Sequence, residues 1–166
     1  MINIGIIGSN GRMGQRIIAL ASEDKNLKIV AKIDQKTPDT IENTLDKIDV
    51  FIDFSFAEAT TKNIKLIKKP IVIGTTGLND SQIAIIKDAS KNIPIVLSPN
   101  MSIGVNVFFK ILEQTAKYLK DYDIELVELH HNKKKDSPSG TAVKIAEIVS
   151  QATGKSKNNW VYGRQG

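Results

Sequence analysis

The sequence predicts an α/β fold built on a doubly wound parallel sheet, followed by a smaller, incomplete α+β region. Over the first hundred residues, short apolar runs alternate with amphipathic helical stretches. The runs are continuous and rich in β-branched residues, as expected for parallel strands that helices cover on both faces. Beyond residue 100 this alternation stops. We therefore expect two domains, at residues 1–100 and 101–166.

The first domain is expected to contain five strands joined by helices. The strands are expected at Ile2–Ile7, Leu27–Ile33, Val50–Phe54, Ile71–Ile73 and Ile95–Leu97. The helices are expected at Gly11–Ser22, Glu58–Lys68 and Asp80–Ala89. Strand–helix–strand repetition joins parallel strands through right-handed crossovers.

The second region has a different pattern. Apolar positions from Val105 to Leu119 trace one face of a long helix, and those from Ala142 to Ala152 trace another, closed by Gly154. Between the helices, Asp123–Leu129 is expected to be a strand, and the polar segment His130–Ser139 a loop. One helix–strand–loop–helix unit has too few elements to cover a sheet, so we expect this domain to be incomplete.

Composition narrows the classes of protein. With 41% hydrophobic and 25% charged residues, the chain is typical of soluble globular proteins. The absence of cysteine excludes disulfides and thiolate chemistry and fits a cytoplasmic protein. Neither a signal peptide nor an apolar run of the ~20 residues that a membrane helix needs is visible.

The net charge of +5 raises the question of a nucleic-acid partner. The lysines are scattered among acidic residues and aromatic residues make up only 5%, so we expect no nucleic-acid partner. A mildly basic protein also suits anionic small molecules.

A glycine-rich turn follows the first expected strand and opens the first helix. Its sequence is Gly8-Ser9-Asn10-Gly11-Arg12-Met13-Gly14. Glycine allows the backbone to approach a pyrophosphate, and the N–H groups of the helix start bind the phosphates. The spacing alone also suits a plain tight turn. In the first strand–helix–strand unit it predicts dinucleotide binding and a Rossmann-type fold.

Asp34 ends the second strand, about twenty residues after the turn, where an acidic residue binds the ribose hydroxyls of the cofactor. The alternative is a solvated turn residue. Lys32 and Lys36 flank Asp34 and could tolerate a 2′-phosphate. We therefore expect NADH and/or NADPH as cofactor, with NADH favoured.

Two further strand ends are expected at the same edge of the sheet. Gly74-Thr75-Thr76-Gly77 follows the fourth strand, and Ser98-Pro99-Asn100-Met101-Ser102 follows the fifth. Each segment taken singly reads as an ordinary turn. Because ligands of doubly wound sheets lie outside the carboxyl ends of the strands, we expect both to border the nicotinamide half of the cofactor.

The most informative stretch runs from Glu128 to Ala142. Ser139 is expected to cap a helix, and the N–H groups of Gly140 and Thr141 open that helix where an anion can bind. No metal is expected, because the clustered side chains are cationic donors without metal-ligand spacing.

The only two histidines of the chain, His130 and His131, are adjacent and lie next to the lysine run 133–135. A solvated loop accounts for Lys133 and Lys135. For His130, His131 and Lys134 we favour a functional role.

These segments, taken together, resemble the family of 4-hydroxy-tetrahydrodipicolinate reductase (dihydrodipicolinate reductase). The family reduces a cyclic unsaturated dicarboxylate with NADH or NADPH in lysine and diaminopimelate biosynthesis. The resemblance covers nearly the whole chain, and the matching segments are Gly8–Gly14, Asp49–Ser55, Val72–Gly77, Asn100–Asn106 and His130–Thr141.

By position, the resemblance implies that His130 is the catalytic histidine and Lys134 the proton donor. It implies that His131, Gly140 and Thr141 hold the substrate carboxylates. The implied dinucleotide contacts are Gly8, Ser9, Asn10, Gly11, Arg12, Met13, Asp34, Gly74, Thr75, Thr76, Ser98, Pro99, Asn100 and Met101. Gln35 stands where the family often carries an arginine, which weakens any preference for NADPH.

Family members continue beyond the equivalent of Gly166, and the resemblance implies that the full-length protein is a homotetramer built through the rest of the substrate domain. Two alternatives stay open. One is a dinucleotide-binding module without turnover, because the C-terminal part is missing. The other is a different small-molecule dehydrogenase, of a type that needs no thiol.

Overall fold

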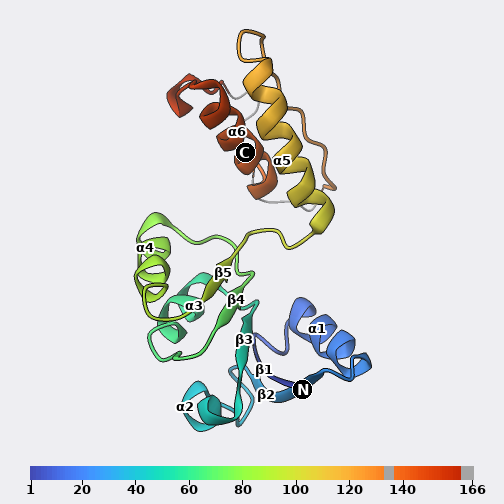
Figure 1. The fold of residues 1–166 in the computed structure, drawn as a ribbon, viewed down its shortest axis with the longest axis vertical. Helices are drawn as coiled ribbons and strands as arrows, with labels where there is room; N and C mark the ends of the chain where they lie inside the picture. The colour runs from blue at the N-terminus through green and yellow to red at the C-terminus, as the bar shows by residue number, and fades with distance from the viewer. Residues whose placement is uncertain (133–136, 162–166) are drawn as a thin grey trace. The chain divides into compact units, whose positions relative to one another are not determined.

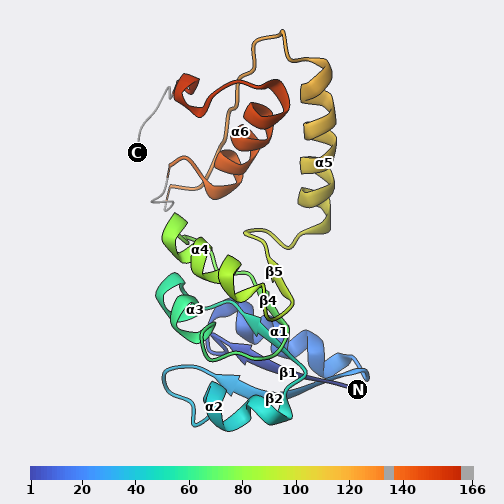
Figure 2. The same cartoon turned by 60° about the vertical axis from the view of Figure 1, so that its left-hand side comes forward.

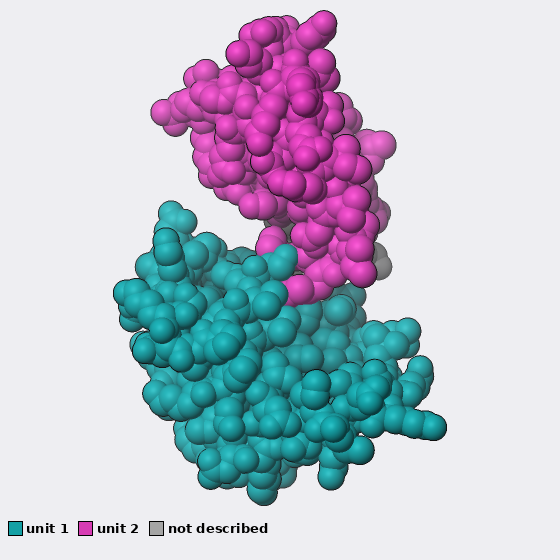
Figure 3. Space-filling model, viewed as in Figure 1, with its two compact units in different colours: residues 1–98 teal, residues 99–166 magenta. Residues whose placement is uncertain are grey.

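The computed structural model describes residues 1–132 and 137–161. The chain divides into two compact units, residues 1–98 and residues 99–166 (Figure 3). No helix in the described part of the chain is long and apolar enough to cross a membrane.

Unit 1 is built on a five-stranded, all-parallel sheet (Figure 1). In the order β2-β1-β3-β4-β5, the strands are Leu27–Ile33, Ile2–Ile7, Val50–Asp53, Ile71–Ile73 and Ile95–Leu97. The predicted α/β class and parallel sheet are confirmed, and β3 ends one residue earlier than expected. The chain runs outward from β1 to β2 and then returns to the other side of β1, so the strand order reverses between β1 and β3. Doubly wound sheets bind ligands at such a reversal.

Helices cover both faces of this sheet. Figure 1 shows α1 (Arg12–Glu23) on one face and α3 (Ala57–Asn63) and α4 (Asp80–Ala89) on the other. Between the two layers, Phe51, Ile6 and Ile73 have no exposed surface. Burial on both faces explains why the strands are continuous apolar runs rather than alternating ones.

The helix predicted to reach Lys68 is shorter in the structure. It ends at Asn63, whose carbonyl accepts hydrogen bonds from the backbone N–H groups of Leu66 and Ile67 (2.9 and 3.3 Å) in the turn that follows. Ile64 and Ile67 are 2% and 3% exposed. In the sequence, these two isoleucines continue the helical pattern. In the structure, their side chains are buried although they lie in a turn, which leads into Pro70 and β4.

Two short elements between β2 and β3 have no counterpart in the prediction. They are α2 (Ile41–Thr44) and the 3₁₀ helix η1 (Leu45–Lys47). Thr40 caps α2, because its hydroxyl accepts from the N–H of Asn43 and the side chain of Asn43 accepts from the N–H of Thr40. A helix of one turn has too few residues to show a hydrophobic period.

Unit 2 is built on a pair of packed helices. It consists of α5 (Ile103–Tyr118) packed against α6 (Gly140–Thr153), followed by the 3₁₀ helix η2 (Lys157–Asn159) (Figure 2). Ser102 caps α5 by accepting from the N–H of Val105. Gly154 follows α6 with a φ of +73°, as expected for a glycine that ends a helix.

The prediction of a strand at Asp123–Leu129 is wrong. Residues 123–129 have no regular secondary structure, and Val127 and Leu129 are 80% and 91% exposed. A β-strand is stabilised by hydrogen bonds to a neighbouring strand, and the described residues of unit 2 contain none. The pattern therefore indicated a segment able to pair, but the described residues of unit 2 offer no strand to pair with.

Phe51 at the centre of the sheet gives a test of this core. Phe51→Ala should lower the free energy of unfolding by about 3–5 kcal/mol, because it removes a fully buried aromatic ring. Urea denaturation followed by circular dichroism measures the change. Phe56→Ala is the matched control, since Phe56 is 52% exposed, and it should change stability by about 0.5 kcal/mol or less. Equal losses in the two variants would contradict the assignment of the core.

Candidate active site

The glycine-rich turn lies directly against the end of β3. Gly8 adopts a φ of +78°, a conformation that favours glycine, and a Cβ added there would lie 2.8 Å from the carbonyl oxygen of Phe54. The turn is held by hydrogen bonds from the Gly8 N–H to the Ile33 carbonyl (2.9 Å) and from the Gly11 N–H to the Gly8 carbonyl (3.1 Å). Gly8 and Gly11 therefore leave backbone without side chains in the turn that precedes α1.

Ser9 supplies an observation that bears on a ligand. It is 1% exposed, and its hydroxyl has no hydrogen-bond partner among the residues that the structure describes. A buried hydroxyl without a partner is costly. The N-cap of α1 is Gly11, which has no side chain to satisfy the first N–H groups of the helix. A donor hydroxyl beside an uncapped helix N-terminus fits the phosphates of a dinucleotide.

Asp34 joins the end of β2 to the glycine-rich turn. One carboxylate oxygen accepts the N–H of Asn10 (3.0 Å) and the other accepts the N–H of Gln35 (2.8 Å). The N–H of Asp34 donates to the hydroxyl of Thr37 at 2.7 Å. The half-buried carboxylate is thus fixed next to the glycine-rich turn, as the ribose-binding hypothesis needs.

The turns after β4 and β5 lie at the same edge. Gly74 and Thr75 are buried and Thr76 is exposed, while the N–H of Ser98 donates to the carbonyl of Ile73 (3.1 Å). The structure thus brings together the predicted residues of unit 1, at the carboxyl ends of β1, β2, β4 and β5. They are Gly8, Ser9, Asn10, Gly11, Arg12, Met13, Asp34, Gly74, Thr75, Thr76 and Ser98.

Asp53 was missed by sequence reasoning as a site residue. It ends β3 with no exposed surface, and it accepts hydrogen bonds from the hydroxyls of Ser55 (2.6 Å) and Thr60 (2.9 Å). The signal was an acidic residue inside the apolar run Val50–Phe54, which argues for a buried, satisfied carboxylate.

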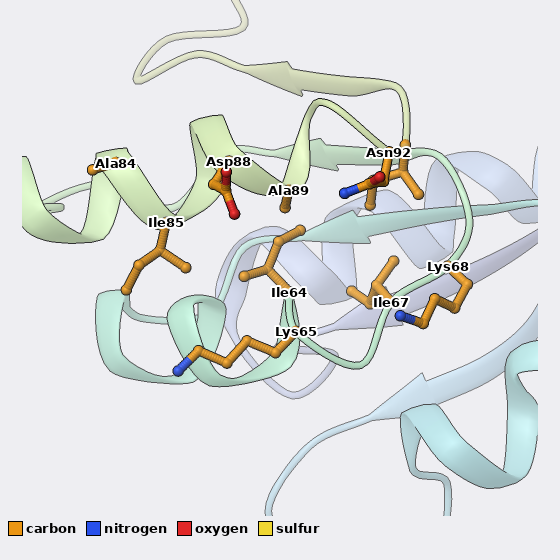
Figure 4. A pocket seen from close by; sticks show the side chains of 10 residues that line it. Ile64, Lys65, Ile67, Lys68, Ala84, Ile85, Asp88, Ala89 and Asn92 are labelled. Carbon is orange, nitrogen blue, oxygen red and sulfur yellow. The ribbon is translucent and has the colours of Figure 1, made fainter.

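A hollow of about 560 Å³ lies elsewhere on unit 1, between the turn after α3 and α4 (Figure 4). Ile64, Lys68, Ile85 and Asn92 are among the residues that line it. Lys68 and Asn92 precede β4 and β5, so the hollow lies toward the amino ends of these strands. It contains none of the predicted site residues.

In unit 2, Asn100 organises the start of α5. Its side-chain oxygen accepts the N–H of Ser102 (2.9 Å), and its carbonyl accepts from the side-chain amide of Asn106 (2.9 Å). Pro99 and Met101 on either side are exposed.

Glu128 connects His130 to the start of α6. One of its carboxylate oxygens lies 2.7 Å from Nε2 of His130, and the other accepts the N–H of Ser139 at 2.9 Å. The Ser139 hydroxyl, which caps α6 by accepting the N–H of Ala142 (3.0 Å), also bonds the carboxylate. These hydrogen bonds, that of the Ser139 hydroxyl above all, lower the pKa of Glu128 to about 2. The sequence placed Glu128 at the start of the informative stretch but indicated no role for it.

Three further predicted residues of unit 2 lie near this connection. Gly140 and Thr141 form the exposed first turn of α6, and His131 is exposed next to His130. Lys134 lies outside the described residues. Within the described ranges, no group of three or more His, Asp or Glu residues could hold a metal ion.

Comparison with known families decides what kind of protein carries these features. The model of the dihydrodipicolinate reductase N-terminus matches residues 2–101, and that of the C-terminus matches residues 104–164. The chain belongs to the dihydrodipicolinate reductase family. The resemblance found in the sequence is confirmed.

Relatives of known function agree. The chain is 41% identical to the 4-hydroxy-tetrahydrodipicolinate reductase of Methanosarcina barkeri, over 100% of this chain and 73% of the relative. It is 42% identical to that of Aquifex aeolicus, over 99% of this chain and 72% of the relative. A solved structure, the dipicolinate-bound dihydrodipicolinate reductase from Paenisporosarcina sp. TG-14, matches with a TM-score of 0.78 and 27% identity, over 100% of this chain and 73% of that one. Reductases of this family use a nicotinamide dinucleotide.

The carboxyl group of Glu128 allows a direct test of the connection in unit 2. Its pKa lies below the ordinary 4.5, so its hydrogen bonds stabilise the folded form above that pH and are lost as the pH falls through about 2. Ser139→Ala should raise this pKa toward 4.5, because the hydroxyl is its largest cause. An NMR titration of the side-chain carboxyl carbon measures it.

Glu113 on α5 is the internal control for this titration. Lys117 and Lys110 lower its pKa to about 2 as well, and Ser139 is not among the causes of this shift. Ser139→Ala should leave Glu113 unchanged. A Glu128 that titrates near 4.5 in the unmodified protein would contradict the geometry.

Proposed function

We propose that this chain catalyses the reduction of 4-hydroxy-tetrahydrodipicolinate, a cyclic unsaturated dicarboxylate, by hydride transfer from NAD(P)H in lysine and diaminopimelate biosynthesis. The observation that carries the proposal is the identity of 41–42% with reductases of that name over 99–100% of the chain. The models of the family's N-terminus and C-terminus both match within this one chain, which supports a dinucleotide end and a substrate end in the same chain.

At the dinucleotide end, the chain supplies binding and orientation. The uncapped start of α1 and the Ser9 hydroxyl hold the pyrophosphate, and Asp34 holds a ribose hydroxyl of the adenosine half. The turns after β4 and β5 border the nicotinamide half. When bound, the reduced nicotinamide supplies the hydride, and the protein contributes position and electrostatics.

At the substrate end, the first turn of α6 binds a carboxylate of the substrate. Gly140 suits this role, because a Cβ added there would meet no atom within 4 Å and packing does not require glycine. The N–H groups of Gly140 and Thr141 and the side chain of His131 hold the anion. Lys134 donates the proton that neutralises the charge left after hydride transfer, and His130 tunes and positions that proton source.

For the complete family member we propose a homotetramer in the cytoplasm, without nucleic-acid or membrane partners. The tetramer is supported by large apolar side chains of unit 2 that are exposed in the single chain. Ile103, Val127 and Leu129 are 82%, 80% and 91% exposed. Apolar surface of this kind commonly marks contacts between chains.

Binding of the two nicotinamide cofactors tests the role of Asp34. NADH should bind at least as tightly as NADPH, because the carboxylate repels a 2′-phosphate. Asp34→Asn should raise NADPH affinity relative to NADH, by calorimetric titration. Asp88→Asn is the control, since Asp88 is an exposed carboxylate of α4 that pairs with Lys91. A clear NADPH preference in the unmodified chain would mean that Lys32 or Lys36 outweighs Asp34.

Turnover tests the function itself. Steady-state oxidation of NADH in the presence of the substrate should be seen, and Lys134→Ala should lower kcat by about 10²–10⁴-fold with little change in cofactor binding. Lys133→Ala and Lys135→Ala should have much smaller effects. Equal losses in all three variants would reduce the lysine run to an electrostatic patch. Cofactor binding without any turnover would instead favour a binding module.

A further inference from the structure

The carboxylate of Asp53 lies at the centre of a buried polar network at the ligand-binding edge of unit 1. Its Oδ1 accepts the N–H and the hydroxyl of Ser55 at 2.8 and 2.6 Å. Its Oδ2 accepts the hydroxyl of Thr60 at 2.9 Å, and the hydroxyl of Thr75 lies 2.9 Å from that of Thr60 and 3.4 Å from Oδ1. Asp53 and Thr60 have no exposed surface, and Thr75 is 3% exposed.

This network joins two turns and a helix. Ser55 lies in the turn after β3, Thr60 in α3, and Thr75 in the turn after β4. Stability alone gives a weak reason for a buried carboxylate, because well-packed apolar residues of the same volume often serve as well. A better reason for the buried carboxylate is that it fixes the positions of the turns that the network connects.

Phe54 ties the same turns to the phosphate-binding turn. A Cβ added to Gly74 would lie 2.2 Å from the Phe54 ring, and one added to Gly8 would lie 2.8 Å from its carbonyl oxygen. The N–H of Phe54 donates to the carbonyl of Ile7 (3.1 Å), and that of Gly74 donates to the carbonyl of Asp53 (2.8 Å). The ends of β1, β3 and β4 are therefore held in one fixed arrangement.

Strand order determines which half of the cofactor meets this arrangement. The pyrophosphate turn follows β1 and Asp34 follows β2, so the adenosine half lies toward β2. In the order β2-β1-β3-β4, the other half then lies over the ends of β3 and β4.

We propose that the network of Asp53, Thr60 and Thr75 is a positioning device for the nicotinamide half of the cofactor. These side chains act through the turns they hold, not by contact with the ligand. The inference rests on the proposed function, since it takes the dinucleotide as the ligand of this edge.

The test compares two ligands on the 166-residue chain by calorimetry. NADH has both halves, and ADP-ribose lacks only the nicotinamide. Thr75→Val removes one hydroxyl at nearly constant volume, while Ser55 and Thr60 still donate to Asp53. It should weaken NADH binding about five- to tenfold, the equivalent of one buried hydrogen bond, and change ADP-ribose binding less than about twofold.

Thr44→Val is the matched control. Thr44 is 4% exposed, and its hydroxyl donates to the Thr40 carbonyl in α2, so the variant also loses a buried threonine hydroxyl in the same unit. Thr44→Val should bind NADH and ADP-ribose with the same affinities as the unmodified chain. Asp53→Asn is the stronger variant and should show the same selectivity as Thr75→Val. Should it fail to fold, Thr75→Val decides.

Three results would overturn the inference. Equal weakening of NADH and ADP-ribose would make the network a general support of the fold. Unchanged NADH binding in Thr75→Val would show that the turn needs no such anchor. An unmodified chain that binds neither ligand would refute the dinucleotide proposal, and this inference with it, whereas the first two results leave that proposal intact.

Discussion

The constraint on which unit 1 depends is the burial of a short parallel sheet on both faces. Phe51 and Ile73 can be removed from water only if helices cover each face, and parallel strands can be joined only by crossovers that return to the starting edge. The carboxyl ends of all five strands therefore meet at one edge. The chain reverses its direction of travel between β1 and β3, so the turns at this edge separate and leave room for a ligand. The location of the site follows from how the core is buried.

Sequence reasoning succeeded where burial leaves a periodic signal. Each of the five strands is a β-branched run that covers its position in the structure, and α4 was predicted with its observed bounds. It failed where other forces decide. Ile64 and Ile67 continue a helical period but are buried from a turn before Pro70, and the one-turn helix α2 depends on a capping box rather than on apolar spacing. The run at Asp123–Leu129 has strand composition, but pairing is a property of two segments and cannot be read from one.

The candidate site divides in the same way. Glycine positions and the His130–Thr141 segment carry a pattern that local sequence displays, so the candidate ligand-binding residues could be proposed from the sequence. Asp53 and Glu128 were not assigned a role, because that role depends in part on hydrogen bonds to partners distant in the sequence. Asp53 meets Thr75 across 22 positions, and Glu128 meets Ser139 across 11. No local spacing reports such contacts before the fold is known.

Asp53 and Glu128 also show that the two units solve one problem with the same chemistry. A helix start or turn that binds a ligand through its backbone must present its own polar groups outward, so other residues have to hold that backbone in place. In unit 1 a buried carboxylate gathers hydroxyls beneath the turn after β4, and in unit 2 a half-buried carboxylate holds the Ser139 N–H beneath the first turn of α6. A carboxylate suits this task because it accepts several hydrogen bonds at once and offers no donor to compete for the ligand. In both units an acidic side chain thus fixes the backbone of a proposed ligand-binding segment.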